Sequence, residues 1–136
     1  MPVKINVYVI THAGLADAFA EATQMIMGPQ PQLRTIGFYA GDDLMETADR
    51  LVAMIQNNPA DFHVVFTDLF GATPSHIGLL AISQCENAAV ITGVNLIAVM
   101  EALGMDGEDV DRQPALQRIE GACKQGVRAL TKDMIS

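Results

Sequence analysis

The sequence has few cysteines and no long apolar run. Cys85 and Cys123 stand alone without a CxxC spacing, which indicates two reduced thiols. No apolar stretch approaches the roughly 18–20 residues that a membrane helix needs. The first residues also lack the charged and apolar regions of a signal peptide. We therefore expect a cytoplasmic protein with no segment inserted directly in a membrane.

Basic residues are scarce. The chain has 8 Lys and Arg against 16 Asp and Glu, which gives a formal net charge of −8 at pH 7. This charge disfavours nucleic acid and anionic membranes as partners, and it is compatible with a basic protein partner. No internal repeat, linker or low-complexity segment divides the 136 residues, so we expect one domain over residues 1–136.

The common signatures of nucleotide and metal sites are missing. No GxGxxG follows the first apolar run and no GxxxxGK[ST] occurs, which disfavours a dinucleotide site and a P-loop. The spacing of His12, His63 and His76 does not require a metal. We therefore expect neither a metal nor a cofactor, and we interpret His63 as a structural or surface residue.

Apolar runs rich in β-branched residues alternate with stretches of helical spacing. This pattern predicts strands at residues 3–10, 33–39, 63–67 and 88–92, and helices at residues 15–27, 44–56, 74–84, 95–103 and 114–124. It indicates an α/β fold: a doubly wound, flavodoxin-like, mainly parallel sheet of four strands with helices on both faces. We interpret residues 126–130 as a short tail strand, although they are too few to be assigned from their sequence alone.

Two of the predicted strands end in reactive side chains. His12 follows the first strand and Asp68 follows the third, and ligands of open α/β sheets bind beyond the carboxyl ends of the strands. Each residue also has an ordinary explanation, as a solvated histidine or a turn aspartate. Together they suggest a carboxylate that holds one ring nitrogen of His12 and leaves the other with a free lone pair for attack.

Small residues flank this pair. Gly14 lets the backbone turn sharply after His12, and the N-terminus of the next helix would stabilise a phosphoryl group on or near the ring. Gly71-Ala72-Thr73-Pro74-Ser75 opens another helix, where backbone N–H groups and the hydroxyls of Thr73 and Ser75 can converge on phosphate oxygens. The residues therefore favour a phosphoryl-transfer protein with a phosphohistidine intermediate.

Three segments occur in a characteristic order along the chain. They are Thr11-His12, Thr67-Asp68-Leu69-Phe70-Gly71-Ala72-Thr73-Pro74-Ser75 and Ile91-Thr92-Gly93-Val94-Asn95-Leu96. Together with the tail at residues 126–130, they resemble the IIA domain of the mannose/fructose family of the bacterial sugar phosphotransferase system (PTS). The long central match is specific, whereas Thr-His alone would not be.

This resemblance implies a transferase, the EIIA component, that accepts a phosphoryl group from the phosphocarrier protein HPr and passes it to a IIB domain. His12 takes the position of the phosphorylated histidine, Asp68 that of its carboxylate partner, and Thr73 that of a Ser or Thr near the phosphate. The residues expected to support the phosphate site are Thr11, Gly14, Gly71, Thr73 and Ser75. The resemblance also implies a homodimer that exchanges the tail strand, which would pair antiparallel with the sheet of the other copy.

Some features leave alternatives open. Position 76 is His where many family members have Asn, so His76 could change the polarity of the site. No IIB domain follows the tail, so the phosphoryl acceptor would be a separate IIB component or a regulatory target. An Asp-phosphorylated receiver is disfavoured, because it needs an acidic pair where this chain has Thr11-His12. A non-catalytic binding module for FMN or another anionic ligand would use the same edge of the sheet.

Overall fold

Strands and helices alternate along the chain, as the sequence predicts. The computed structural model describes residues 1–135. The strands are β1 (Ile5–His12), β2 (Leu33–Phe38), β3 (Phe62–Thr67) and β4 (Ala88–Ile91). The helices are α1 (Leu15–Met27), α2 (Leu44–Gln56), α3 (Thr73–Ile82), α4 (Leu96–Gly104), α5 (Arg112–Gln125) and the single turn α6 (Lys132–Ile135).

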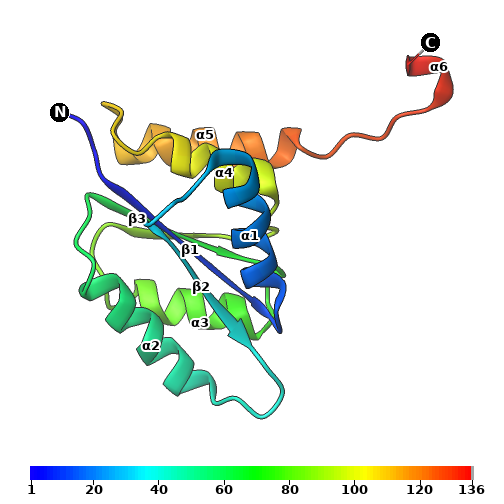
Figure 1. The fold of residues 1–136 in the computed structure, drawn as a ribbon. Helices are drawn as coiled ribbons and strands as arrows, with labels where there is room; N and C mark the ends of the chain where they lie inside the picture. Colours follow the sequence, from blue (N-terminus) through cyan, green and yellow to red (C-terminus); the bar gives the residue numbers. More distant parts are fainter. Residues whose placement is uncertain (136) are drawn as a thin grey trace.

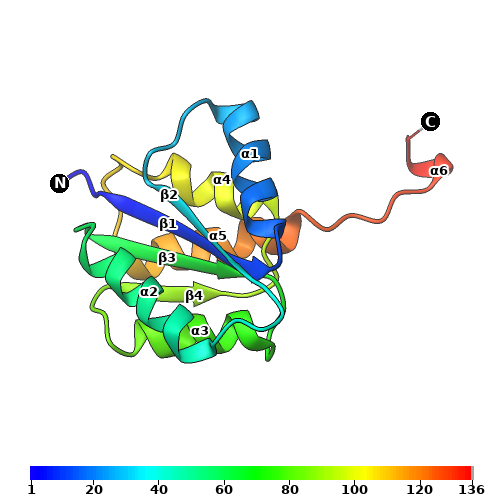
Figure 2. The same ribbon diagram turned by 60° about the horizontal axis from the view of Figure 1, so that its bottom comes forward.

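Within residues 1–135 the sheet has four parallel strands in the order β2-β1-β3-β4. Figures 1 and 2 show α2 and α3 on one face of the sheet and α1, α4 and α5 on the other. The predicted doubly wound α/β fold is therefore confirmed. Because β1 and β3 are the central strands, their carboxyl ends lie side by side at one edge of the sheet.

The side chains of β1 alternate between two apolar cores. Val7 and Val9 pack in the core beneath α1, α4 and α5, whereas Tyr8 and Ile10 pack in the core beneath α2 and α3. All four side chains have no exposed surface. A strand covered by helices on both faces needs apolar residues at every position, which explains the continuous apolar run in the sequence.

Polar caps begin two of the helices. The carboxylate of Asp43 accepts the backbone N–H of Glu46 at 2.9 Å, and the amide oxygen of Asn95 accepts that of Ala98, also at 2.9 Å. Each bond satisfies one of the N–H groups that the first turn of a helix leaves without a partner. Asp43 is thus the N-cap of α2 and Asn95 that of α4.

The first predicted strand and the tail strand differ from the structure, and the remaining predicted boundaries agree with it to within two residues. The first strand runs over Ile5–His12 rather than residues 3–10, because β2 continues the ladder and pairs Thr11 with Gly37 and His12 with Phe38. The expected tail strand does not form: residues 127–131 have no regular secondary structure and extend away from the body (Figure 1). A strand requires a neighbour to bond with, and the tail has none within the described single chain.

Candidate functional site

His12 and Asp68 meet at the carboxyl edge of the sheet. Their strands are neighbours, with Ile10 of β1 opposite Thr67 of β3. The Nδ1 atom of His12 lies 2.8 Å from the Oδ2 atom of Asp68. The same oxygen accepts the backbone N–H of His12 at 3.0 Å, while Oδ1 accepts that of Leu69, also at 3.0 Å. The carboxylate thus has three donors and binds both the ring and the backbone of His12.

The protonation of this pair follows from its hydrogen bonds. Burial raises the pKa of Asp68, but the bonds from the His12 backbone, the His12 ring and the Leu69 N–H outweigh it, so the pKa of Asp68 lies below its ordinary value. The carboxylate is therefore ionised at neutral pH and can only accept. Nδ1 of His12 must then carry the hydrogen, and a neutral ring has its free lone pair on Nε2.

The two side chains differ in exposure. The His12 side chain is 48% exposed and that of Asp68 is 12% exposed. Within residues 1–135, Nε2 of His12 has no hydrogen-bond partner. The arrangement therefore presents an unpaired, nucleophilic ring nitrogen toward solvent and shields the carboxylate that orients it.

Thr11 joins the end of β1 to the start of α1. It is fully buried, and its hydroxyl accepts the N–H of Ala16 at 2.7 Å and donates to the carbonyl of His12 at 3.1 Å. The Thr11 hydroxyl thus acts as both a hydrogen-bond donor and an acceptor within the protein. Thr11 supports the position of His12 and is not exposed to a ligand.

The turn after His12 differs from the expectation for Gly14. Gly14 has a φ of −84°, which any residue adopts, and the positive φ of 49° belongs to Ala13. The residue that the turn requires to be glycine is Gly37 of β2. A Cβ at Gly37 would lie 2.3 Å from the carbonyl oxygen of Ala13. Sequence reasoning missed Gly37, because its role depends on the β1–β2 register.

The loop from Gly71 to Ser75 is closed by a side chain. Gly71 has a φ of +82°, and its N–H donates to the Ser75 hydroxyl at 2.9 Å. That hydroxyl in turn donates to the carbonyl of Ala72 at 2.8 Å, and Ser75 is only 1% exposed. The Ser75 hydroxyl therefore bonds within the loop and holds the loop in shape. Thr73 begins α3, is partly exposed, and has no hydroxyl partner within residues 1–135.

The other histidines have different surroundings. His63 is 5% exposed and its Nδ1 lies 2.9 Å from the Tyr8 hydroxyl, near the amino end of β3. Burial, and then the nearby Arg34, lower the pKa of His63. This agrees with the structural interpretation of His63. His76 is exposed in the first turn of α3, and in the part of the chain that the structure describes no three His, Cys, Asp or Glu side chains form a metal-binding group.

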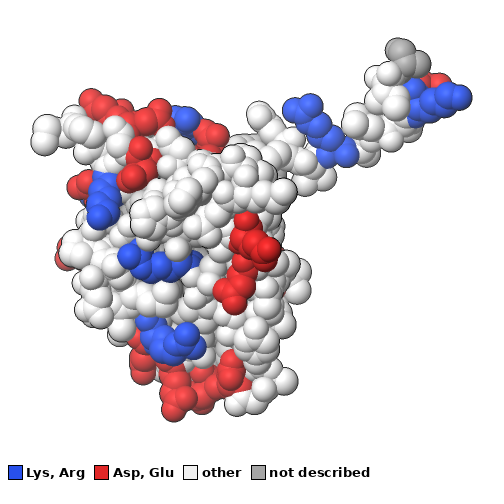
Figure 3. All heavy atoms as spheres, in the orientation of Figure 1, with Lys and Arg blue, Asp and Glu red and all other residues white. Residues whose placement is uncertain are grey.

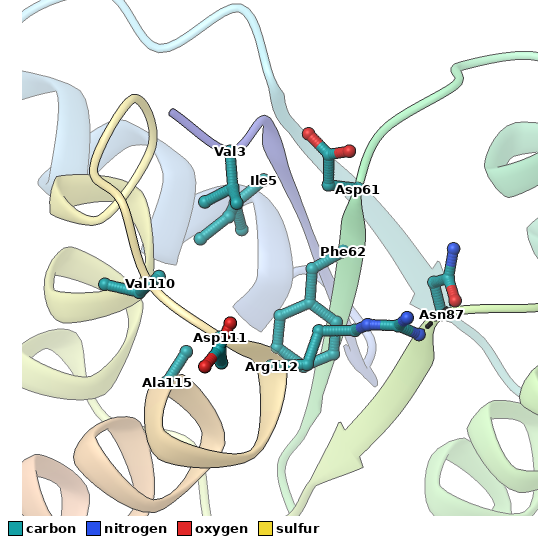
Figure 4. A pocket seen from close by; sticks show the side chains of 9 residues that line it. All are labelled: Val3, Ile5, Asp61, Phe62, Asn87, Val110, Asp111, Arg112 and Ala115. Carbon is teal, nitrogen blue, oxygen red and sulfur yellow. Dashed lines mark hydrogen bonds between the residues drawn. The ribbon is translucent and has the colours of Figure 1, made fainter. Parts of the chain in front are cut away.

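The molecule also has a hollow at the opposite edge of the sheet. This pocket has a volume of about 240 Å³. Figure 4 shows it between the amino ends of β1 and β3 and the start of α5. Val3, Ile5 and Phe62 contribute apolar side chains, and Arg112 extends past Phe62 to donate to the amide oxygen of Asn87. Because it lies at the amino ends of the strands, this hollow is not part of the His12 site.

The charge of the surface is mostly negative. Figure 3 shows Asp and Glu side chains at the top, the bottom and the right-hand side of the visible face, with smaller groups of Lys and Arg, several of them beside acidic residues. The four segments at the carboxyl edge, residues 11–15, 38–44, 67–73 and 91–96, contain Asp42, Asp43 and Asp68 but no Lys or Arg. A phosphoryl group at His12 would therefore be stabilised by backbone N–H groups and hydroxyls rather than by basic side chains of these segments.

Comparison with solved structures identifies the class of fold. The structure superposes on the phosphotransferase system component EIIA from Streptococcus agalactiae with a TM-score of 0.83, at 20% identity over 92% of this chain and 96% of that one. It also superposes on the mannose/sorbose-specific IIA subunit from Enterococcus faecalis with a TM-score of 0.82, at 22% identity over 94% and 96% of the two chains. The fold is thus that of PTS IIA proteins.

Sequence comparison identifies the family. Residues 6–119 match the family model described as the PTS system fructose IIA component, and the chain belongs to this family. A relative is the sorbose-specific EIIA component of Lacticaseibacillus casei, which is 29% identical over 97 residues, or 71% of this chain and 70% of the relative. The chain is thus a PTS IIA component of the mannose/fructose/sorbose type. None of the helices in residues 1–135 combines the length and apolar character needed to cross a membrane.

Proposed function

We propose that this protein is a cytoplasmic, single-domain IIA component that accepts a phosphoryl group from HPr on Nε2 of His12. It then passes the group to a separate IIB component or uses it as a regulatory signal. The observation that carries the proposal is the contact between Nδ1 of His12 and the ionised Asp68, which leaves Nε2 without a partner on a side chain that is 48% exposed. A histidine phosphoramidate keeps a high transfer potential, so a reversible relay is its natural use.

The transfer step conserves atoms and charge. The Nε2 lone pair of His12 forms a bond to phosphorus while the P–N bond of the phosphorylated HPr histidine breaks, and that electron pair returns to the donor nitrogen. The hydrogen on Nδ1 stays in place, where Asp68 stabilises the positive charge that develops on the ring. Because no proton has to move at the ring, the protein's task is positioning and charge stabilisation.

The loop before α3 is the proposed phosphate cradle. Gly71 shapes it, Ser75 fixes its geometry, and Thr73 offers a free hydroxyl beside the first N–H groups of α3. A helix N-terminus attracts anions, because its N–H groups lack partners inside the helix and the helix dipole is positive there. We assign Thr11 to the support of the His12 turn through its hydroxyl bonds, and Gly14 to the N-cap position of α1.

The tail completes the proposed assembly. A groove of about 430 Å³ follows the outer edge of β4, where Leu79, Val90 and Leu116 contribute apolar lining. The apolar side chains of Val127 and Leu130 are 80% and 68% exposed on the extended tail. We propose that the tail of one copy pairs antiparallel with β4 of a second copy, which covers an open strand edge and buries these side chains.

Labelling of the protein tests the proposed function. Incubation with phosphoenolpyruvate, enzyme I and HPr is expected to give an acid-labile, base-stable phosphoprotein, and His12→Ala is expected to abolish it. His76→Ala is the matched control, since His76 is exposed near the same loop. Label that persists in His12→Ala would place the phosphate elsewhere. A flavin released on denaturation would instead support the anionic-ligand alternative.

A further inference from the structure

We propose that Leu69 and Phe70 form the surface on which the phosphoryl-donor protein docks, so that they set the affinity for a protein donor without taking part in the chemistry. This inference rests on the proposed phosphorylation of His12. It adds the residues that recognise the donor, and with them the character of the surface that the donor must present.

Both side chains are apolar and exposed next to the reactive pair. Leu69 is 60% exposed and Phe70 is 84% exposed, and they follow Asp68 directly in the chain. A single exposed apolar residue is ordinary, but here two follow the carboxylate that contacts the exposed His12 ring. Aromatic residues are also the type most often found at the energetic centre of protein interfaces.

The backbone that carries these residues is held in place. The N–H of Leu69 donates to the Asp68 carboxylate at 3.0 Å, and the N–H of Ala72 donates to the carbonyl of Leu69 at 3.4 Å. The N–H of Gly71 donates to the Ser75 hydroxyl at 2.9 Å. A partner that binds Phe70 therefore does not have to order the loop first, which lowers the entropic cost of binding. The first of these bonds also connects Leu69 to the carboxylate that contacts His12.

The surrounding charge indicates the kind of partner. The carboxyl-edge segments hold Asp42, Asp43 and Asp68 and have no Lys or Arg. A donor that carries a phosphoryl dianion would be repelled unless it brought its own cations, and complementary charges also steer association. The surface therefore fits a partner with an apolar contact patch and basic residues around its phosphorylated side chain.

A second copy of this chain is the competing occupant. Phe70 also lines the groove beside β4, together with Leu79 and Leu116. The donor is favoured because Phe70 lies two residues after Asp68, the partner of His12, and its side chain is 84% exposed. The groove, in contrast, extends along β4 to residues that a paired tail would cover. Oligomeric state is therefore measured for every variant below.

Two phosphoryl donors separate docking from chemistry. Phosphorylated HPr requires a docking surface, whereas phosphoramidate is a small donor that does not. For Phe70→Ala we expect the KM for phosphorylated HPr to rise about tenfold, equivalent to about 1.4 kcal/mol of lost binding. We expect a smaller rise for Leu69→Ala, and in both variants an unchanged kcat and an unchanged rate with phosphoramidate. Met25→Ala is the control, because Met25 is 90% exposed near the far end of α1.

Three results would overturn the inference. An unchanged KM for phosphorylated HPr in Phe70→Ala would show that Phe70 does not contact the donor. Equal slowing with both donors would show that Phe70 positions the site instead. Dissociation of a dimer in light scattering would show that a second copy covers it. If the unsubstituted protein accepts phosphate from neither donor, the proposed function fails, and this inference fails with it.

Discussion

A single oxygen atom of Asp68 holds both the ring and the backbone of His12. Oδ2 lies 2.8 Å from Nδ1 and 3.0 Å from the backbone nitrogen of the same residue. The carboxylate therefore fixes the tautomer of the ring and the end of the strand that carries it. Orientation and electrostatic stabilisation of the histidine thus depend on one side chain.

Asp68→Asn is expected to slow phosphorylation of His12 about 10²-fold or more, by analogy with the loss of the orienting carboxylate in a hydrolase triad. The amide keeps the shape of the side chain but removes the charge that stabilises the imidazolium character of the phosphorylated ring. The measurement is the rate of labelling by phosphorylated HPr, with thermal unfolding as a check that the fold is intact.

The chemical stability of the phosphoprotein distinguishes this role from its rival. A phosphohistidine is acid-labile and base-stable, whereas an acyl phosphate on Asp68 would be base-labile. Labelling that is base-labile and lost in Asp68→Asn, yet retained in His12→Ala, would show that Asp68 is the acceptor, as in a receiver domain.

The sequence predicted the edge of the sheet at which this pair lies, because alternating strands and helices bring the carboxyl ends of parallel strands together. It also suggested that Asp68 contacts a ring nitrogen of His12, but it did not give the strand order on which this contact depends. His12 reaches Asp68 only because β1 and β3 are neighbours, and the order β2-β1-β3-β4 is not encoded in any local pattern. The bonds of the Ser75 hydroxyl within its own loop were not predicted either, because they depend on the backbone geometry of that loop.

The importance of Gly37 also depends on strand pairing and could not be predicted from its neighbours in the sequence. Substitution of Gly37 tests its role. Gly37→Ala would place a Cβ 2.3 Å from the Ala13 carbonyl oxygen, so the turn after His12 must shift. We expect a loss of about 1–3 kcal/mol in the free energy of unfolding, typical of overpacking, and slower phosphorylation of His12. Urea denaturation and the labelling rate measure the two effects.

Gly14→Ala is the control for this substitution. Gly14 has a φ of −84°, and the nearest atom to a new Cβ would be the Tyr39 hydroxyl at an ordinary 3.6 Å. We expect its stability to remain within about 1 kcal/mol of the unsubstituted protein. Equal damage from the two substitutions would contradict the assignment of the constraint to Gly37.

His63 is expected to make stability depend on pH. Burial, followed by Arg34, lowers the pKa of His63 below its ordinary 6.5. Between 6.5 and the lowered value, the unfolded chain binds a proton that the folded chain does not, so the free energy of unfolding falls as the pH falls. A single proton can make this slope at most about 1.4 kcal/mol per pH unit.

Urea denaturation at several pH values between 7.5 and 5 tests this expectation. His63→Gln keeps an acceptor for the Tyr8 hydroxyl but cannot titrate, so its pH dependence is expected to be shallower. His76→Gln, at an exposed position, is the control and should keep the original slope. A slope that does not change in His63→Gln would mean that other groups carry the pH dependence.

We expect the tail at residues 126–130 to be required for formation of the homodimer. β4 lies at the edge of the sheet, and Val127 and Leu130 are exposed on a tail that has no regular structure in the single chain. A strand of about five residues has little stability alone, but pairing with β4 of another copy would satisfy its backbone groups and cover the open edge.

Truncation after Gly126 retains the backbone hydrogen bond from the Gly126 N–H to the Ala122 carbonyl at the end of α5, and it removes the proposed contact. We expect a homodimer for the full chain at micromolar concentration and monomer or aggregate for the truncated chain, measured by light scattering. Removal of residues 131–136 alone keeps the proposed strand and should leave the dimer intact. A monomeric full-length protein, or a stable dimer without the tail, would show that the tail is not the assembly element.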